Sequence, residues 1–257
     1  MRRIVIAVIV GLSLATSALA EQASRLDDII KRGSLRVGLT GDYLPFSSLD
    51  KETSKFRGFD VDMAEALGKA LGVKVDYVPT AWPQLMKDFE ADGFDIAMGG
   101  VSITFDRQKK GLFSLPIMRE GKTPIARCAD QGKYESLADI DKAGTRVIVN
   151  PGGTNERFAR ANVKNAEIKV YNDNVTIFDQ IANGDADLMM TDSSETRYQQ
   201  KLHAGVLCAV HPDKPFDFAE KAYWLQRDSA FKAFVDQWLH LSMEDGSFKK
   251  IYAAWFE

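Results

Sequence analysis

Apolar and polar residues follow two rhythms that alternate along the chain. Over 59–71 the apolar residues recur every three or four positions, which predicts a helix. Other apolar runs are short or strictly alternating, which predicts strands. In the first half of the chain the predicted strands are 35–40, 73–78 and 94–100, and the predicted helices are 59–71 and 82–91.

The same succession begins again in the second half. Strands are predicted at 145–150, 167–171, 186–192 and 219–226, and helices at 151–161, 174–184, from 193 onward, near 229–244 and near 246–256. Strands that alternate with helices are typical of a parallel sheet with helices on both faces. Two such units in tandem predict an α/β fold of two lobes, with a ligand cleft between them where the strands end.

The first twenty residues have the pattern of a secretory signal peptide. Arg2 and Arg3 precede an apolar run at 4–14, and Ala18-Leu19-Ala20 forms a cleavage site. The apolar run is too short for a spanning helix, although a permanent anchor is the alternative. We expect a signal peptide at 1–20, a mature chain in the periplasm and no stable membrane insertion.

Composition narrows the classes of function. The chain has 257 residues, 45% of them hydrophobic, and a net charge of −3, which argues against a nucleic-acid partner. Outside the cytoplasm, Cys128 and Cys208 favour one disulfide, with two buried thiols as the alternative. Two cysteines and three histidines lack the spacing of a metal cluster, so we expect no metal.

The turns after residues 40 and 100 carry candidate ligand contacts from the first half. In "GDYLPFS", Tyr43 and Phe46 could cover a ligand or belong to the core. In "GGVSITFDR", the two glycines allow backbone amides to approach a ligand, and Ser102 offers a hydroxyl. Arg107 could hold a carboxylate through paired hydrogen bonds, or be a solvated charge.

The turns after residues 150 and 192 add contacts from the second half. "NPGGTNE" opens a helix whose free N–H groups attract anions, with Gly153, Thr154 and Asn155 at its start; a helix cap without a ligand is the alternative. An anion site in each lobe suits a small dicarboxylate, or an acid with a second polar end. "MMTDSSETRYQ" then places Asp192 and Glu195 three residues apart.

The chain from about residue 25 resembles the extracytoplasmic amino-acid-binding receptors of ABC transporters. The resemblance is carried by "GDYLPF", "GFDVDMA", "FDIAMGGVSIT", "GGTNE" and "ADLMMTD" in that order. It implies a periplasmic-binding-protein-like type II fold, two α/β lobes joined by two crossover strands. It also implies that Tyr43 covers the ligand, that its carboxylate is held by Ser102, Arg107 and Thr154, and that its amino group is held by Asp192. We expect lobe 1 at 21–119 plus 214–257 and lobe 2 at 120–213.

Longer strings are similar to a catalytic offshoot of these receptors, the periplasmic cyclohexadienyl dehydratases. They include "WPQLMKDF", "IVNPGGTNERFARAN", "DNVTIFDQI" and "PFDFAEKAY". The resemblance implies conversion of prephenate to phenylpyruvate, with loss of water and carbon dioxide, and of arogenate to phenylalanine, without metal or organic cofactor. The alternative is a receptor that delivers an amino acid to a transporter. The sequence leaves the oligomeric state open, and a homo-oligomer is compatible with it.

Glu195 separates the two alternatives. Residues three apart on a helix share one face, so Glu195 could enter the same cleft as Asp192 and donate a proton to the leaving hydroxyl. The alternative is a capping box, in which Glu195 folds back onto the helix start. Lys122 could pair with a substrate carboxylate or be solvated, and Trp82 could border the substrate ring or pack in the core.

Overall fold

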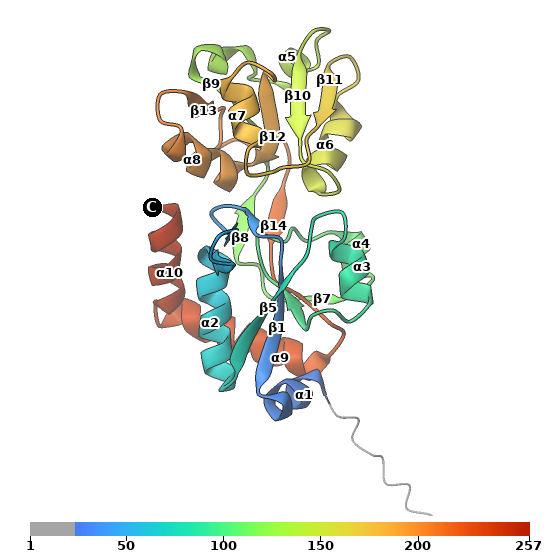
Figure 1. Cartoon of the computed structure of the whole chain (residues 1–257), viewed down its shortest axis with the longest axis vertical. Helices are drawn as coiled ribbons and strands as arrows, with labels where there is room; N and C mark the ends of the chain where they lie inside the picture. Colours follow the sequence, from blue (N-terminus) through green and yellow to red (C-terminus); the bar gives the residue numbers. More distant parts are fainter. Residues whose placement is uncertain (1–23) are drawn as a thin grey trace, which may run out of the picture.

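The structure, a computed structural model, describes residues 24–257, so the predicted signal peptide lies outside the described residues. Two α/β lobes lie end to end along the long axis (Figure 1). Strands β8 (Met118–Glu120) and β14 (Ala219–Lys221) pair antiparallel between them. The boundaries expected at 120 and 214 stay a prediction, and both lie near these strands. Within the described part of the chain, no helix has the length and apolar character needed to cross a membrane.

The sheet of lobe 1 has five strands. Its order is β5 (Lys74–Pro79), β1 (Ser34–Leu39), β6 (Ile96–Ala97), β15 (Trp224–Leu225) and β7 (Leu112–Phe113). β1 runs parallel to β5 and β6, as predicted, but β15 is antiparallel to both of its neighbours. The reason is that β15 follows β14 out of the crossover, so it enters the sheet from the end where β1 and β6 leave it.

The sheet of lobe 2 repeats this plan. Its order is β11 (Glu167–Val170), β10 (Arg146–Val149), β12 (Leu188–Asp192), β9 (Lys122–Arg127) and β13 (Leu207–Ala209). β9 enters from the crossover and pairs antiparallel with β12, in a register that sets Lys122 opposite Asp192. β10, β11 and β12 therefore pair parallel as predicted, and β9 and β13, which the sequence did not predict, add antiparallel pairs to the sheet.

All of the predicted helices are present; α2 and α9 have the predicted bounds, and α3, α6, α7 and α10 begin later than predicted. Lobe 1 contains α1 (Arg25–Arg32), α2 (Phe59–Leu71), α3 (Leu85–Glu90), α4 (Phe105–Gln108), α9 (Ser229–Glu244) and α10 (Ser247–Phe256). Lobe 2 contains the 3-10 turn η1 (Cys128–Lys133) and helices α5 (Leu137–Ile140), α6 (Thr154–Asn162), α7 (Ile177–Ala182) and α8 (Ser193–Leu202). The single strand predicted at 219–226 is two strands, because its first part pairs with β8 and its second part joins the sheet.

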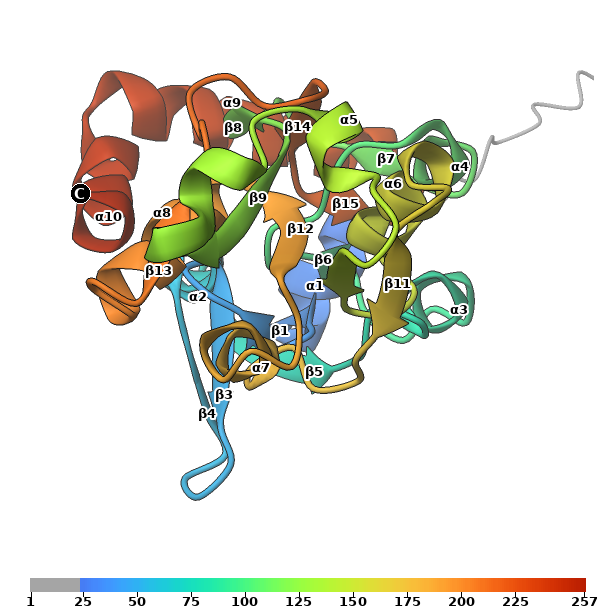
Figure 2. The same cartoon turned by 90° about the horizontal axis from the view of Figure 1, so that it is seen from above.

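A small antiparallel sheet stands apart from the two large ones. It consists of β2 (Asp42–Tyr43), β3 (Ser47–Asp50) and β4 (Lys55–Arg57). Strands β3 and β4 project from the body as a hairpin (Figure 2). The base of this sheet lies beside the cleft, so it carries Tyr43 to the ligand side of lobe 1.

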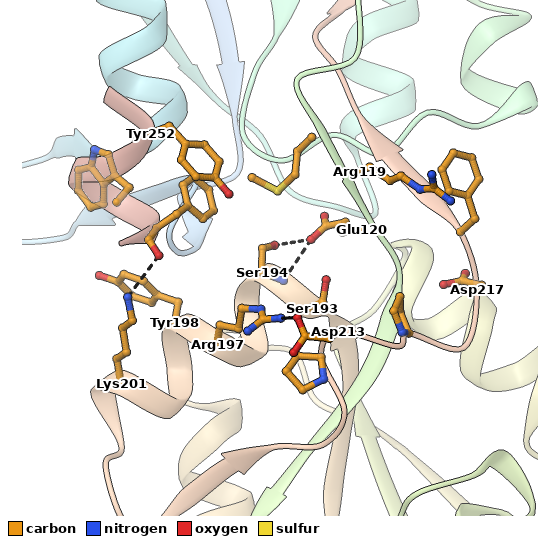
Figure 3. A pocket seen from close by; sticks show the side chains of 16 residues that line it. Arg119, Glu120, Ser193, Ser194, Arg197, Tyr198, Lys201, Asp213, Asp217 and Tyr252 are labelled. Carbon is orange, nitrogen blue, oxygen red and sulfur yellow. Dashed lines mark hydrogen bonds and ion pairs between the residues drawn. The ribbon is translucent and has the colours of Figure 1, made fainter. Parts of the chain in front are cut away.

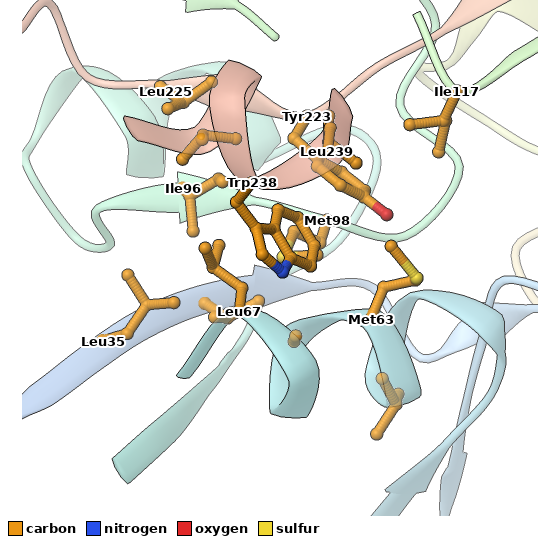
Figure 4. Close-up of a cluster of buried hydrophobic side chains, with 14 of the residues drawn as sticks. Leu35, Met63, Leu67, Ile96, Met98, Ile117, Tyr223, Leu225, Trp238 and Leu239 are labelled. Carbon is orange, nitrogen blue, oxygen red and sulfur yellow. The ribbon is translucent and has the colours of Figure 1, made fainter. Parts of the chain in front are cut away.

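The main core of lobe 1 lies between its sheet and helices α2 and α9. Met63 and Leu67 from α2 face Trp238 and Leu239 from α9, with Ile96 of β6 beside them (Figure 4). Helix α2 ends at Gly72, which has a left-handed backbone conformation. Full burial of one such apolar side chain stabilises the fold by about 1.5–3 kcal/mol. This core fixes the strand ends from which the site is built.

The disulfide predicted between Cys128 and Cys208 is confirmed. The two sulfur atoms lie 2.10 Å apart and connect η1 to β13. The pair closes a loop of 80 residues within lobe 2. Among the described residues, no group of His, Cys, Asp and Glu side chains could hold a metal ion.

Candidate active site

A narrow pocket lies between the lobes where the predicted turns meet. It is lined by Tyr43, Trp82, Gly100, Ser102, Asn150, Gly153, Thr154, Asn155, Asp192 and Lys221. Eight of these residues, Gly100 included, are ones that the sequence singled out, and they come from both lobes. The two lobes are in direct contact around the pocket, for example where Asn174 donates a hydrogen bond to the Asp42 carbonyl at 2.8 Å.

Asp192 lies at the centre of the pocket. Its Oδ1 accepts a hydrogen bond from Lys122 Nζ at 2.6 Å, and its Oδ2 accepts one from Lys221 Nζ at 2.7 Å. The Tyr43 hydroxyl donates to the same Oδ2 at 2.5 Å, across the cleft. Burial alone would raise the pKa of Asp192, but the two ammonium groups outweigh it and hold this pKa well below its usual range. Asp192 is therefore a carboxylate bound on both oxygens.

Lys122 is buried, which excludes the solvated alternative. Its Nζ also donates to Thr154 Oγ1 at 2.9 Å and to Asn155 Oδ1 at 2.5 Å. The residue is 2% exposed, and burial lowers its pKa despite the nearby Asp192. These hydrogen bonds connect Lys122, the first residue of β9, to the start of α6, where the sequence predicted an anion site.

Lys221 is a site residue that sequence reasoning missed. Besides Asp192, its ammonium contacts Ser102 Oγ at 2.9 Å and lies over the Tyr43 ring, 5.1 Å from the centroid. Burial would lower the pKa of Lys221, but Asp192 and Glu120 outweigh it and raise this pKa. The sequence feature that could have indicated it is a lysine directly before the apolar residues of a predicted strand, in "AEKAYWLQ".

Arg107 is buried beside the pocket rather than solvated. Its Nη1 donates to the Ser102 carbonyl at 2.8 Å, and the residue is 5% exposed. Burial lowers its pKa to about 10, and repulsion from Arg157 adds to the effect. No carboxylate of the described residues lies within ion-pair distance of this guanidinium. A buried cation without an acidic partner is costly, so the arrangement favours an anionic ligand.

Glu195 is fully buried on the first turn of α8. Its Oε2 accepts a hydrogen bond from Thr191 Oγ1 at 2.5 Å, while its buried Oε1 has no partner among the described residues. Asp192 makes no side-chain cap of α8, so the capping-box alternative is wrong. Glu195 does not line the narrow pocket, but the charges that act on it are those of Asp192, Asp42 and Lys122, which surround the cleft.

Burial favours the neutral form of the Glu195 carboxyl group. Burial raises its pKa well above the usual range, and Asp192 and Asp42 raise it further, against the Thr191 hydrogen bond. Thr191 Oγ1 in turn accepts from Asn155 Nδ2 at 3.0 Å. This chain of hydrogen bonds fixes one Glu195 oxygen and leaves the other, Oε1, buried without a partner among the described residues.

Trp82 and Tyr43 combine the roles that the sequence left open. The two rings meet edge to face with centroids 5.6 Å apart, and Tyr43 also stacks on Phe46 at 5.1 Å. Trp82 Nε1 donates to Asp42 Oδ1 at 3.0 Å. Burial raises the pKa of Asp42, against this hydrogen bond. Both rings line the pocket, and Tyr43 also belongs to the lobe 1 core.

The glycines after β6 do not offer their amides to a ligand, contrary to the prediction. The N–H groups of Gly99 and Gly100 donate to Asp60 Oδ2 at 2.7 and 2.6 Å. Burial raises the pKa of Asp60 to about 6, against these two hydrogen bonds. Gly100 has a φ of 73°, and a Cβ there would lie 2.5 Å from the Tyr43 ring. These glycines therefore seat the Tyr43 ring and bind α2.

A second, larger groove of about 580 Å³ lies between the lobes, beside the crossover strands. It is lined by residues of β8, α8 and α10 and contains none of the predicted site residues (Figure 3). The chemistry predicted from the sequence therefore belongs to the narrow pocket, although the groove is the larger space.

Comparisons with known sequences agree on one family. Residues 35–257 match the profile of the bacterial extracellular solute-binding proteins, family 3. A cyclohexadienyl dehydratase from Pseudomonas aeruginosa is 55% identical over 244 residues, which cover 95% of this chain and 90% of that protein. The L-cystine-binding protein TcyJ of Escherichia coli K12 is 29% identical over 187 residues, 73% of this chain and 68% of that protein.

Solved structures give the same picture. An ancestral amino acid-binding protein, described as a precursor of cyclohexadienyl dehydratase, matches with a TM-score of 0.84 and 37% identity, covering 91% of this chain and 100% of that one. An ancestral cyclohexadienyl dehydratase is 52% identical, with a TM-score of 0.57 and coverage of 91% and 97%. The fold is thus that of periplasmic binding proteins of type II.

Proposed function

The chain belongs to the bacterial extracellular solute-binding proteins, family 3, and we propose that it works as a cyclohexadienyl dehydratase, a carbon–oxygen lyase. Identity of 55% over 95% of the chain to a protein of that name supports the proposal. The family and the disulfide indicate a location outside the cytoplasm. We propose the periplasm, because residues 1–20 have the pattern of a signal peptide.

The proposed reaction is the conversion of prephenate to phenylpyruvate, and of arogenate to phenylalanine. The ring C–O bond breaks, and the oxygen keeps its electron pair and takes a proton from Glu195 to leave as water. The electrons of the bond to the ring carboxylate move into the ring, which becomes aromatic, and carbon dioxide leaves. Glu195 is then a carboxylate and regains its proton from solvent. Proton donation of this kind contributes about 10²–10⁴ in rate.

The charges around the pocket fit a dicarboxylate. The cations of the pocket are Arg107, Lys122 and Lys221, and Asp192 is the carboxylate that two of them bind. Arg107 has no acidic partner among the described residues, so we assign it one substrate carboxylate. We assign the other substrate carboxylate to Lys122, together with Thr154 and Asn155 at the start of α6. Tyr43 and Trp82 are assigned to the faces of the ring.

The single observation that carries the catalytic part is the Glu195 carboxyl group. It is buried, its pKa is raised well above the usual range, and its Oε1 has no partner among the described residues. A neutral carboxylic acid with a free oxygen beside a cation-rich cleft is the equipment of a general acid. In the closed arrangement Glu195 lies outside the narrow pocket lining, so we propose that substrate entry separates Tyr43 from Asp192 and opens the path to it.

A second candidate function is an amino-acid receptor, favoured by the TM-score of 0.84 to an ancestral amino acid-binding protein. In that function Asp192 would hold the ligand's ammonium group. Both oxygens of Asp192 are already bound by lysine ammonium groups, which disfavours a second cation there. The dehydratase is therefore the function that the site supports better.

One experiment separates the two functions. Purified mature protein is mixed with prephenate, and phenylpyruvate is followed by its absorbance in alkali. In parallel, the same preparation is titrated with each of the common amino acids in a calorimeter. We expect catalytic turnover of prephenate. Absence of turnover together with tight binding of an amino acid would replace the enzyme by the receptor.

A further inference from the structure

Glu120 is a buried carboxyl group to which the proposed reaction gives no task. It is the last residue of β8, between the lobes, and its side chain is 2% exposed. Burial raises the pKa of Glu120, and the neighbouring Lys221 ammonium opposes this rise. A carboxyl group buried at such a place costs free energy unless it is paired, so its partners indicate what it does.

The two oxygens of Glu120 contact different elements. Oε1 forms an ion pair with Lys221 Nζ on β14 at 3.2 Å, without a hydrogen bond. Oε2 accepts hydrogen bonds from the Ser194 hydroxyl at 2.5 Å and from the Ser194 N–H at 3.2 Å (Figure 3). The next residue, Gly121, accepts a hydrogen bond from the Ser193 N–H at 3.0 Å. The crossover is thus tied both to a pocket lysine and to the first turn of α8.

This position connects the two components on which the proposed chemistry depends. Ser194 directly precedes Glu195, the proposed acid, on the first turn of α8. Lys221 lines the pocket and binds Asp192. Glu120 and Ser194 line the neighbouring groove instead, so they lie between that groove and the pocket. A displacement of Glu120 would therefore move both Glu195, the proposed acid, and the ammonium group of Lys221.

We propose that Glu120 is a positioning residue for the dehydration reaction, holding the first turn of α8 through Ser194 and the ammonium group of Lys221 through its second oxygen. The inference rests on the proposed function, because it assigns Glu120 a role in placing that reaction's acid. It does not require Glu120 to touch the substrate. The crossover strand that joins the lobes thereby sets the geometry of the cleft.

Two variants separate the two contacts. Ser194→Ala removes the hydroxyl that Glu120 accepts from and leaves every charge in place. Glu120→Gln keeps an oxygen for Ser194 but sets an amide against the Lys221 ammonium, with little change in volume. Glu220→Gln is the matched control, because Glu220 lies on β14 opposite Arg119, and no hydrogen bond or ion pair of its side chain occurs among the described residues.

Distinct kinetic changes are expected. Ser194→Ala should lower kcat about tenfold with KM within about twofold, because only the placement of the acid changes. Glu120→Gln should raise KM about tenfold, because Lys221 loses one of its two acidic partners and its fixed position. If Glu120 acted only through its negative charge, its removal would lower KM for a dianionic substrate. A lowered KM therefore overturns the positioning role. Unchanged constants in both variants also overturn it.

A readout that needs no turnover separates this inference from the proposed function. Hydrogen exchange of the peptide over 193–197 should be faster in Ser194→Ala and Glu120→Gln than in wild type, and unchanged in Glu220→Gln. Inactive wild-type protein with this exchange pattern would refute the dehydratase and keep the anchoring role. Unchanged exchange in both variants would refute the anchoring role whatever the activity. If Glu120→Gln does not fold, the Ser194→Ala result decides.

Discussion

Replacing Glu195 by Gln tests the proposed acid with almost no change in shape. The amide oxygen can still accept the hydrogen bond from Thr191, now 2.5 Å from Glu195 Oε2, and the NH2 group can still contact a leaving hydroxyl. The variant cannot transfer a proton. General acid catalysis contributes about 10²–10⁴ in rate, so kcat for prephenate should fall by that factor, equivalent to roughly 3–5 kcal/mol of barrier. KM should change less than about threefold, because no charge is removed.

The assay is the formation of phenylpyruvate from prephenate under saturating substrate. Glu244→Gln, the same substitution at an exposed position of α9, serves as the control and should keep wild-type kinetics. A Glu195→Gln variant that turns over at more than about one tenth of the wild-type rate would refute the assignment, since even the smallest general-acid contribution exceeds that.

The same variant has a second expected consequence, on stability. Burial raises the pKa of Glu195 well above its usual range, whereas the unfolded chain ionises near about 4.3. Below that pH Glu195 is protonated in both the folded and the unfolded state, so its ionisation does not affect the free energy of unfolding. As pH rises toward the folded pKa, only the unfolded state loses its proton, so wild type loses stability relative to Glu195→Gln. Urea unfolding at about pH 4 and pH 7.5 should show the Gln variant gaining on wild type at the higher pH; a gain at the lower pH would contradict the burial argument.

Three further predictions concern the rest of the site and the fold. Arg107→Gln should raise KM for prephenate about 10- to 150-fold, because hydrogen bonds to charged groups contribute about 1.5–3 kcal/mol; an unchanged KM would remove Arg107 from the site. Lys221→Met leaves buried Asp192 with one lysine instead of two and should lower the free energy of unfolding by about 3–5 kcal/mol in urea titrations, and a loss below about 1 kcal/mol would contradict the pairing. The double variant Cys128→Ala with Cys208→Ala removes the disulfide that closes a loop of 80 residues, so its free energy of unfolding should fall by roughly 4 kcal/mol. Wild type in reductant should lose the same amount. A larger loss in the double variant than in reduced wild type would indicate lost packing.

The helices followed from hydrophobic periodicity because one face of each is buried, and the central strands followed from short apolar runs because both of their faces are buried. Helix α2 has the predicted bounds, since its apolar face recurs with the helical period up to Gly72. Strands β9 and β13 and the small sheet of β2 to β4 were not predicted. Their pairing partners lie far away in sequence, so no local pattern encodes them. For the same reason the antiparallel entry of β15 could not be derived from its own residues.

The site was predictable where a strand ends in polar residues. Ser102, Thr154 and Asp192 follow predicted strands, and the structure brings them to one pocket. Lys221 and Glu120 escaped prediction because they come from the crossover, where the chain passes between lobes without the strand–helix alternation. The amides of the glycines after β6 were assigned to a ligand, but the competing Asp60 carboxylate lies 39 and 40 positions away in sequence and takes them.

The charge of the cleft explains why the acid must be neutral before the chemistry begins. Besides Glu195, three cations face three carboxyl groups around the cleft. The cations are Arg107, Lys122 and Lys221, and the carboxyl groups are Asp192, Glu120 and the partly buried Asp42. An ionised Glu195 would make these acids outnumber the bases and would repel a dianion from a buried site. Burial that favours the protonated form of Glu195 therefore supports both parts of the proposal, the binding of a dicarboxylate and the departure of its hydroxyl. We propose that two lysines and one neutral acid suit this cleft to a ring diacid rather than to an amino acid.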